Sequence, residues 1–144
     1  SVFIISSTFD VRSNPLSDYI NDDFVRMAAS MSDQRTVINS MLIAVNPAKG
    51  FERTSKVLDM MNTETVIRLE NMSRSEVVNS LLRAEIYLDL GNHPGKDRIP
   101  REAAILGNCI LTNTQGAAAF YNDLPIIKKY KTSEVEEVRK NIIE

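Results

Sequence analysis

The sequence is short of cysteine, of net positive charge and of long apolar runs. Cys109 is the only cysteine among 144 residues, so the chain cannot form an intramolecular disulfide or a cysteine metal cluster, and it suits a reducing compartment. The formal net charge of -2 lacks the basic excess that a protein needs to bind nucleic acid or a membrane surface. No apolar run approaches the roughly 20 residues that span a bilayer, and no basic segment precedes the apolar start SVFIISS. We therefore expect a soluble, cytoplasmic chain that does not bind nucleic acid.

Several catalytic motifs are also missing. The sequence contains no G-x-G-x-x-G fingerprint and no Walker lysine motif, which argues against dinucleotide reductases and phosphate-loop NTPases. It has one histidine, His93, and no nucleophile elbow that would position a serine, which argues against a serine hydrolase. We predict neither a cofactor nor a metal site.

The sequence does contain the element order of an α/β domain. Its 144 residues, of which 43% are hydrophobic and 25% charged, suffice for one domain with an apolar core. From residue 36 onward, apolar runs rich in branched side chains alternate with segments whose apolar residues have helical spacing. The predicted strands are 36–45, 63–71, 85–90 and 109–113, and the predicted helices are 51–61, the helix that follows Ser73, 100–107 and 132–144.

Specific residues mark some of the helix ends. Ser73 and Glu76 have the spacing of a capping box, and Gly107 stands where a helix commonly ends. Ser133 is predicted to cap the last helix. The apolar stripe of that helix is expected to pack within this chain, and it consists of Val135, Val138, Ile142 and Ile143.

This order predicts an α/β fold with a Rossmann-like, doubly wound parallel sheet and helices on both faces. Residues 36–144 would form that domain. Residues 1–35 are largely polar and interrupted by Pro15, and we interpret them as a leading segment or an interdomain linker. In such a sheet, ligands bind beyond the carboxyl ends of the strands. The segments NPAKG and GNHPGKDRIPRE follow the first and third predicted strands, so they are the predicted site.

The first of these segments places Lys49 beside Gly50. Glycine lets the backbone approach an anion closely, and the lysine ammonium adds a positive charge. Two interpretations stay open for this short pattern, an anion site and a surface turn with a solvated lysine.

The second segment holds more polar side chains. It combines donors and acceptors of hydrogen bonds, namely His93, Lys96, Asp97, Arg98, Arg101 and Glu102. A phosphate-bearing ligand with hydroxyl groups needs such a mixture. A solvated loop with internal ion pairs, each of small energetic value, explains the composition equally well. For His93, a hydrogen-bonded loop residue is the alternative to a catalytic role.

The order NPAKG, VIRLEN and SRSEVVNSLLRAEIYLDLGNHPGKDRIPREAAILGNCILTNTQGAAAF resembles the C-terminal, donor-binding half of glycosyltransferases with the two-domain GT-B architecture. The likeness is to bacterial polysaccharide-biosynthesis members. It covers roughly residues 36–130, and its most specific part is residues 91–119.

The resemblance implies roles for individual residues. Lys49 and Gly50 would contact the nucleotide diphosphate, and Glu102, in the PREAAILG pattern, would hold the ribose hydroxyls. The loop with Gly95, Lys96 and Asp97 would cover the sugar and phosphates, and Arg98 would help Lys96 to neutralise the leaving diphosphate. Many retaining members carry a further glutamate where this sequence has Pro94. Its neighbours His93 and Asp97 are the two candidates to replace it, and His93 is the predicted catalytic residue.

The function implied is transfer of a sugar from a nucleotide-sugar donor to an acceptor hydroxyl, in polysaccharide biosynthesis. The acceptor, a glycan or a lipid-linked glycan, would bind an N-terminal domain that 144 residues cannot supply, so the chain is interpreted as a fragment. The full enzyme could associate peripherally with a membrane. The rival hypothesis is a non-catalytic α/β interaction or regulatory domain that retains the fold.

Overall fold

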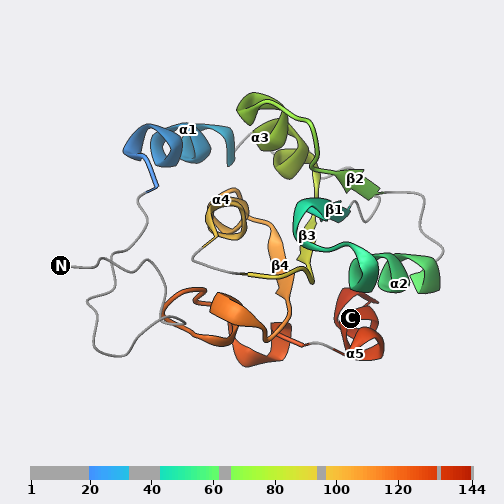
Figure 1. Ribbon diagram of the computed structural model, residues 1–144. Helices are drawn as coiled ribbons and strands as arrows, with labels where there is room; N and C mark the ends of the chain where they lie inside the picture. Colours follow the sequence, from blue (N-terminus) through green and yellow to red (C-terminus); the bar gives the residue numbers. More distant parts are fainter. Residues whose placement is uncertain (1–19, 33–42, 62–65, 94–96, 133, 144) are drawn as a thin grey trace.

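The fold is built on a parallel four-stranded sheet with the order β2-β1-β3-β4 (Figure 1). The computed structural model describes residues 20–32, 43–61, 66–93, 97–132 and 134–143. The strands are β1 (Ile43–Val45), β2 (Val66–Arg68), β3 (Ile86–Asp89) and β4 (Cys109–Thr112). Ile43 is aligned with Val66 on one side and with Ile86 on the other. The prediction of an α/β fold with a parallel sheet is therefore confirmed.

Helices cover both faces of this sheet (Figure 1). One face carries α1 (Asp22–Ser32), α3 (Arg74–Arg83) and α4 (Arg98–Ile105), and the other carries α2 (Glu52–Met61) and α5 (Val135–Ile143). Because successive side chains of a strand point to opposite faces, Tyr87 joins the first core cluster while Ile86 and Leu88 join the second. Burial of β1 and β3 on both faces explains why their sequences are almost continuously apolar.

The residues predicted to mark helix ends can be compared with the helices of the structure. Ser73 caps α3, and both hydrogen bonds of the capping box with Glu76 are present. Gly107 has a φ of 85° just after α4, and α4 begins at Arg98, two residues before the predicted start. Val138 and Ile142 of α5 are buried in the second cluster, as expected, whereas Ile143 is exposed. The predicted cap Ser133 and the strand residues 36–42 and 63–65 lie outside the described residues.

Part of the segment predicted to be a leader or linker is a helix that packs on the core. In α1, Phe24 is 4% exposed and Ala28 is 1% exposed, and both belong to the cluster that contains Leu81 of α3. Phe24, Met27, Ala28 and Met31 have helical spacing, a signal that the interpretation of residues 1–35 did not use. Residues 20–32 are thus part of the packed structure.

The chain between β4 and α5 forms short turns. It contains η2 (Gly116–Ala119) and η3 (Lys128–Tyr130). The Lys131 ammonium is buried and donates to the carbonyls of Leu124, at 2.7 Å, and Phe120, at 3.4 Å. Burial lowers the pKa of Lys131, and the charge of Asp123 opposes this effect. These bonds join the turns to one another, and a bridge between Lys131 and Thr112 joins them to β4.

Candidate functional site

The strand order places a topological switch between β1 and β3. The chain leaves β1 toward β2 and leaves β3 toward β4, on the opposite side, so the loops after β1 and β3 diverge at this point. Ligands of open parallel sheets bind in the crevice that such divergence opens. The loop after β1 contains η1 (Pro47–Lys49) and Gly50, and the loop after β3 leads through His93 to Asp97, the N-cap of α4.

A buried polar network lies at the end of β3. Asp89 is 0% exposed, and its carboxylate accepts hydrogen bonds from the Tyr87 hydroxyl, at 2.9 Å, and from the Gly91 amide, at 3.1 Å. Burial is the largest cause that raises the pKa of Tyr87, and the charge of Asp89 and the hydrogen bond to it add to the effect. Tyr87 therefore stays protonated and serves as a donor to Asp89.

His93 lies between two carboxylates. Its Nδ1 is 2.5 Å from Oδ2 of Asp97, and its Nε2 is 3.8 Å from Oδ1 of Asp89 and 3.4 Å from the Asp89 carbonyl oxygen. The His93 side chain is 1% exposed. Since both ring nitrogens face acceptors, the imidazolium form, which donates from both nitrogens, fits this position. The Asp97 carboxylate binds His93 and makes no capping hydrogen bond to α4. In this arrangement His93 is a positioning residue that ties β3 to the start of α4.

The balance of effects on His93 raises its pKa above 6.5. Burial is the largest single effect and lowers the pKa. The hydrogen bond to Asp97 and the charges of Asp89 and Asp97 together outweigh it. The groups that face the imidazole are thus Asp89 from β3 and Asp97 from the N-cap of α4, with Tyr87 behind Asp89.

A pH dependence of stability follows from this raised pKa. Between the unfolded pKa and the higher folded pKa, the folded chain binds more protons than the unfolded chain, so stability falls as pH rises. We expect the contribution of His93 to be complete below about pH 6.5 and to be lost as pH rises through the folded pKa. Urea unfolding at pH values from 5.5 to 9, compared with His93→Gln, measures this difference. A stability difference between the two proteins that is constant over this range would contradict it.

The loop after β4 packs against the loop that carries His93 and forms hydrogen bonds with it. The Asn113 side chain is 0% exposed and donates to the carbonyls of Leu90, at 2.8 Å, and Gly91, at 2.6 Å. The Ala117 amide donates to the His93 carbonyl at 2.8 Å. Gly116, with a φ of 57°, approaches the same carbonyl so closely that a Cβ atom there would lie 2.1 Å from the oxygen. The network around His93 is therefore held from three sides by β3, α4 and the β4 loop.

A second cluster joins the first turns of α3 and α4. Oε1 of Glu102 is 2.9 Å from a terminal nitrogen of Arg74 and 3.3 Å from Nε of Arg98. The Glu102 side chain is 4% exposed, whereas those of Arg74 and Arg98 are 49% and 55% exposed. One buried carboxylate thus holds two guanidinium groups at the carboxyl edge of the sheet, and the three groups together carry a net charge of about +1.

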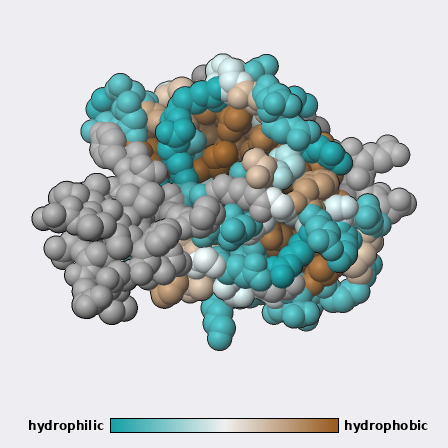
Figure 2. Space-filling view, in the orientation of Figure 1, coloured by the Kyte–Doolittle hydropathy of each residue, from teal (hydrophilic) through white to brown (hydrophobic). Residues whose placement is uncertain are grey.

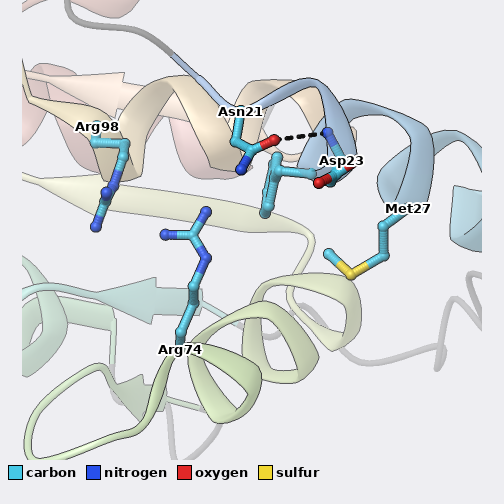
Figure 3. A pocket seen from close by; sticks show the side chains of 6 residues that line it. Asn21, Asp23, Met27, Arg74 and Arg98 are labelled. Carbon is cyan, nitrogen blue, oxygen red and sulfur yellow. Dashed lines mark hydrogen bonds between the residues drawn. The ribbon is translucent and has the colours of Figure 1, made fainter.

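These arginines line a cavity of about 360 Å³ between α1, α3 and α4. In Figure 3 their side chains extend from the two helices toward the same space, and Asn21 faces it from the segment before α1. Next to it, Met27, Met31 and Val78 contribute to a hollow between α1 and α3. Figure 2 shows hydrophobic residues gathered there and surrounded by hydrophilic ones. The arrangement suits an anionic ligand with an apolar part.

The structure brings together some of the predicted site residues. Asp97 and His93 are in contact, and Arg98 and Glu102 are in contact, all at one end of α4. Gly50, with a φ of 107°, follows η1 at the end of the neighbouring strand β1. The remaining predicted residues are Lys49, which ends η1 and whose side chain is not described, and Gly95 and Lys96, which lie outside the described residues, as does Pro94.

Arg74, Asp89 and Asn113 are site residues that the sequence analysis did not identify. Arg74 follows the capping serine of α3, so its place in the first helical turn was readable, but its partner Glu102 is 28 residues away. Asp89 and Asn113 stand at or next to the carboxyl ends of β3 and β4. Polar residues at the ends of buried strands are the signal that could have found both.

Two further observations concern the described part of the chain. None of its helices is both long and apolar enough to cross a membrane. Within the same ranges, no group of three or more His, Cys, Asp or Glu side chains is arranged to hold a metal ion.

In comparisons with known proteins, no family model, no curated protein and no solved structure matches this sequence.

Proposed function

We propose that the chain is the donor-binding domain of a glycosyltransferase and that it binds a nucleotide-linked sugar at the carboxyl edge of its sheet. The observation that carries the proposal is the pair Arg74 and Arg98, which meet on Glu102 beside a cavity of about 360 Å³. The cavity volume falls within the range of roughly 300–1,000 Å³ that is usual for small-molecule sites.

Charge supports a diphosphate ligand at this edge. Guanidinium groups form paired hydrogen bonds with phosphate oxygens, and the first turns of helices add a favourable field for anions. Arg74 and Arg98 lie in the first turns of α3 and α4 and remain about half exposed, so their outer nitrogens are available to a ligand. Glu102 keeps both groups oriented.

The resemblance to GT-B enzymes adds the sugar and the ribose contacts to the proposal. Lys49 and Gly50 would contact the diphosphate from the end of β1, and Lys96 and Asp97 would lie over the sugar. The resemblance assigns the ribose hydroxyls to Glu102; because its side chain is 4% exposed beneath Arg74 and Arg98, contact with a ribose would require one of these arginines to move aside. The proposed partners are the nucleotide sugar and an acceptor glycan, free or lipid-linked, that a further domain would bind.

One observation favours a second candidate, a binding or regulatory domain without catalysis. His93 is 1% exposed and both of its ring nitrogens face carboxylates, so it is not placed to exchange a proton with a substrate. Incubating a longer protein that includes the proposed acceptor-binding domain with UDP- and GDP-sugars and measuring free sugar separates the two candidates, because a pure binding protein releases none.

Calorimetric titration with UDP and GDP tests the binding proposal. We expect Arg98→Ala to weaken nucleotide diphosphate binding by about 10- to 100-fold, since a hydrogen bond to a charged group is worth roughly 1.5–3 kcal/mol. Arg83→Ala, which removes the same charge from the last turn of α3 and not from the cavity lining, is the matched control and should bind like the wild type. Absence of binding by the wild type, or equal losses in both variants, would overturn the proposal.

A further inference from the structure

His93 and Asp97 join the buried network at the end of β3 to the amino end of α4. Oδ2 of Asp97 lies 2.5 Å from Nδ1 of His93. Asp97 is also the N-cap residue of α4, yet its side chain makes no capping hydrogen bond to the helix. The residue after it is Arg98, whose side chain extends with that of Arg74 toward the cavity (Figure 3). The direction in which the Asp97 carboxylate points therefore affects the charge beside this arginine pair.

The helix offers the Asp97 carboxylate an alternative partner. An N-cap side chain accepts a hydrogen bond from the amide of the second or third helical residue, and these residues are Ile99 and Pro100. Proline has no amide hydrogen, so the Ile99 amide is the capping donor at this helix end. The Asp97 carboxylate thus has a choice of two partners, the His93 ring, which it contacts in the structure, and the Ile99 amide.

The protonation state of His93 determines which partner is favourable. An imidazolium ring donates from both nitrogens and can hold Asp89 and Asp97 at once, whereas a neutral ring has one donor and one acceptor. After loss of the proton, one carboxylate faces a lone pair of the ring. The Asp89 side chain is 0% exposed, whereas that of Asp97 is 16% exposed and can turn to the Ile99 amide. Because a carboxylate without a donor is most costly where it is buried, we expect neutral His93 to keep its proton on Nε2, toward Asp89.

The other groups around the ring come from β3, α4 and the loop after β4. From β3, Tyr87 donates to Asp89 at 2.9 Å and stays protonated, because burial and the charge of Asp89 raise its pKa. From α4, Nε of Arg101 donates to the backbone carbonyl of Asp97 at 3.2 Å, and its charge is present in both protonation states of the imidazole. In the loop after β4, residues 113–119 are uncharged. The proton that changes at this point is therefore the one on the imidazole.

We propose that loss of the His93 proton releases the Asp97 carboxylate to the amino end of α4, where its negative charge weakens the binding of an anion by the arginine pair. This regulation rests on the proposed function. A helix amino end favours anions, and a carboxylate that already occupies it opposes a second one. Because the pKa of His93 is raised above 6.5, the change is expected above that pH. His93 is then a positioning residue that acts on the ligand through Asp97.

NMR of the whole chain without ligand tests the release of Asp97. The nitrogen shifts of the His93 ring identify which nitrogen is protonated, and the shift of the Ile99 amide reports its hydrogen bond. From pH 5.5 to 9, we expect the ring to change from imidazolium to the Nε2–H tautomer and the Ile99 amide shift to change with the same midpoint. A neutral ring protonated on Nδ1, or an Ile99 shift that does not follow the ring, overturns the proposal.

Calorimetric titration with UDP-glucose and GDP-mannose at pH 6 and pH 9 tests the effect on binding, since the diphosphate of a nucleotide sugar does not titrate in this range. We expect the wild type to bind about 3- to 10-fold more weakly at pH 9. Asp97→Ala lacks the carboxylate and should bind equally at both pH values. Asp59→Ala, which removes the same charge from an exposed position of α2 on the other face of the sheet, is the matched control and should keep the wild-type pH dependence.

The possible results separate this inference from the proposed function. Equal binding by the wild type at both pH values, or a pH dependence that persists in Asp97→Ala, overturns the regulation and leaves donor binding supported. Absence of binding at either pH overturns the proposed function and the regulation that rests on it. Asp97→Asn keeps the shape of the side chain without its charge and should also bind equally at both pH values. Circular dichroism shows whether the two Asp97 variants are folded.

Discussion

Replacing Gly116 with alanine is expected to destabilise the protein by about 3 kcal/mol, because it combines backbone strain with overpacking. The added Cβ would lie 2.1 Å from the carbonyl oxygen of His93 and 2.9 Å from its carbonyl carbon. Both atoms are backbone, so no side chain can turn away to make room. The φ of 57° also disfavours alanine. A fall in melting temperature of roughly 10 °C, measured by differential scanning calorimetry, corresponds to this loss.

Gly50→Ala is the matched control for this substitution. Gly50 also has a positive φ, 107°, but an added Cβ there would meet no atom within 4 Å. Its replacement therefore reports backbone strain alone, about 1–3 kcal/mol for a residue forced into a sparsely populated conformation. The Ala117 amide, which donates to the His93 carbonyl, should also exchange faster with solvent in Gly116→Ala than in Gly50→Ala. If the two variants lost the same stability and the exchange rates agreed, the close approach of the two loops would be refuted.

Replacing His93 with alanine is expected to cost about 3 kcal/mol near pH 6, because it leaves a buried carboxylate without its cationic partner. Asp89 is 0% exposed, and among the described residues it would keep the hydrogen bonds from Tyr87 and Gly91. Asp97 would lose its contact to the ring and with it the link between β3 and α4. Guanidinium chloride unfolding measures the free-energy change.

A double-substitution cycle distinguishes the loss of the ion pair from the loss of ring packing. His93→Ala and Asp97→Ala should together cost less than the sum of the two single changes, by roughly 0.5–3 kcal/mol, since the groups are in contact. Asn92→Ala, at an exposed neighbouring position, is expected to be within about 0.5 kcal/mol of the wild type. Strict additivity of His93 and Asp97 would show that they do not interact.

The parts of the fold that follow from local chemistry were predictable from the sequence. The capping box of Ser73 and Glu76 needs only residues three apart, and the apolar runs of β1, β3 and β4 reflect their burial. The α1 helix was missed although its spacing carried the signal. The surrounding polar residues and Pro15 were given more weight than the regular recurrence of Phe24 and Ala28.

The predicted site was less complete because its contacts join distant parts of the chain. Arg74 and Glu102 are 28 residues apart, and Asn113 reaches back over more than 20 residues to Leu90 and Gly91. No pattern of spacing encodes such pairs. The composition of residues 91–102 indicated a polar cluster, but it did not indicate that Asp97 would be engaged by His93, or that Glu102 would be buried beneath two arginines. Both facts depend on how α3 and α4 pack on the sheet.

The turn beyond η3 has a consequence for how copies of this protein behave at high concentration. Thr112 of β4 forms a parallel bridge with Lys131, and the Thr132 amide donates to the Thr112 carbonyl at 2.9 Å. An outer strand with unpaired backbone groups is a template for strand addition by another molecule, and covering it suppresses aggregation. At this end of the sheet, the bridge at Thr112 occupies one backbone position that a second molecule would otherwise use. At the other end of the sheet, the described part of the edge strand β2 consists of residues Val66–Arg68.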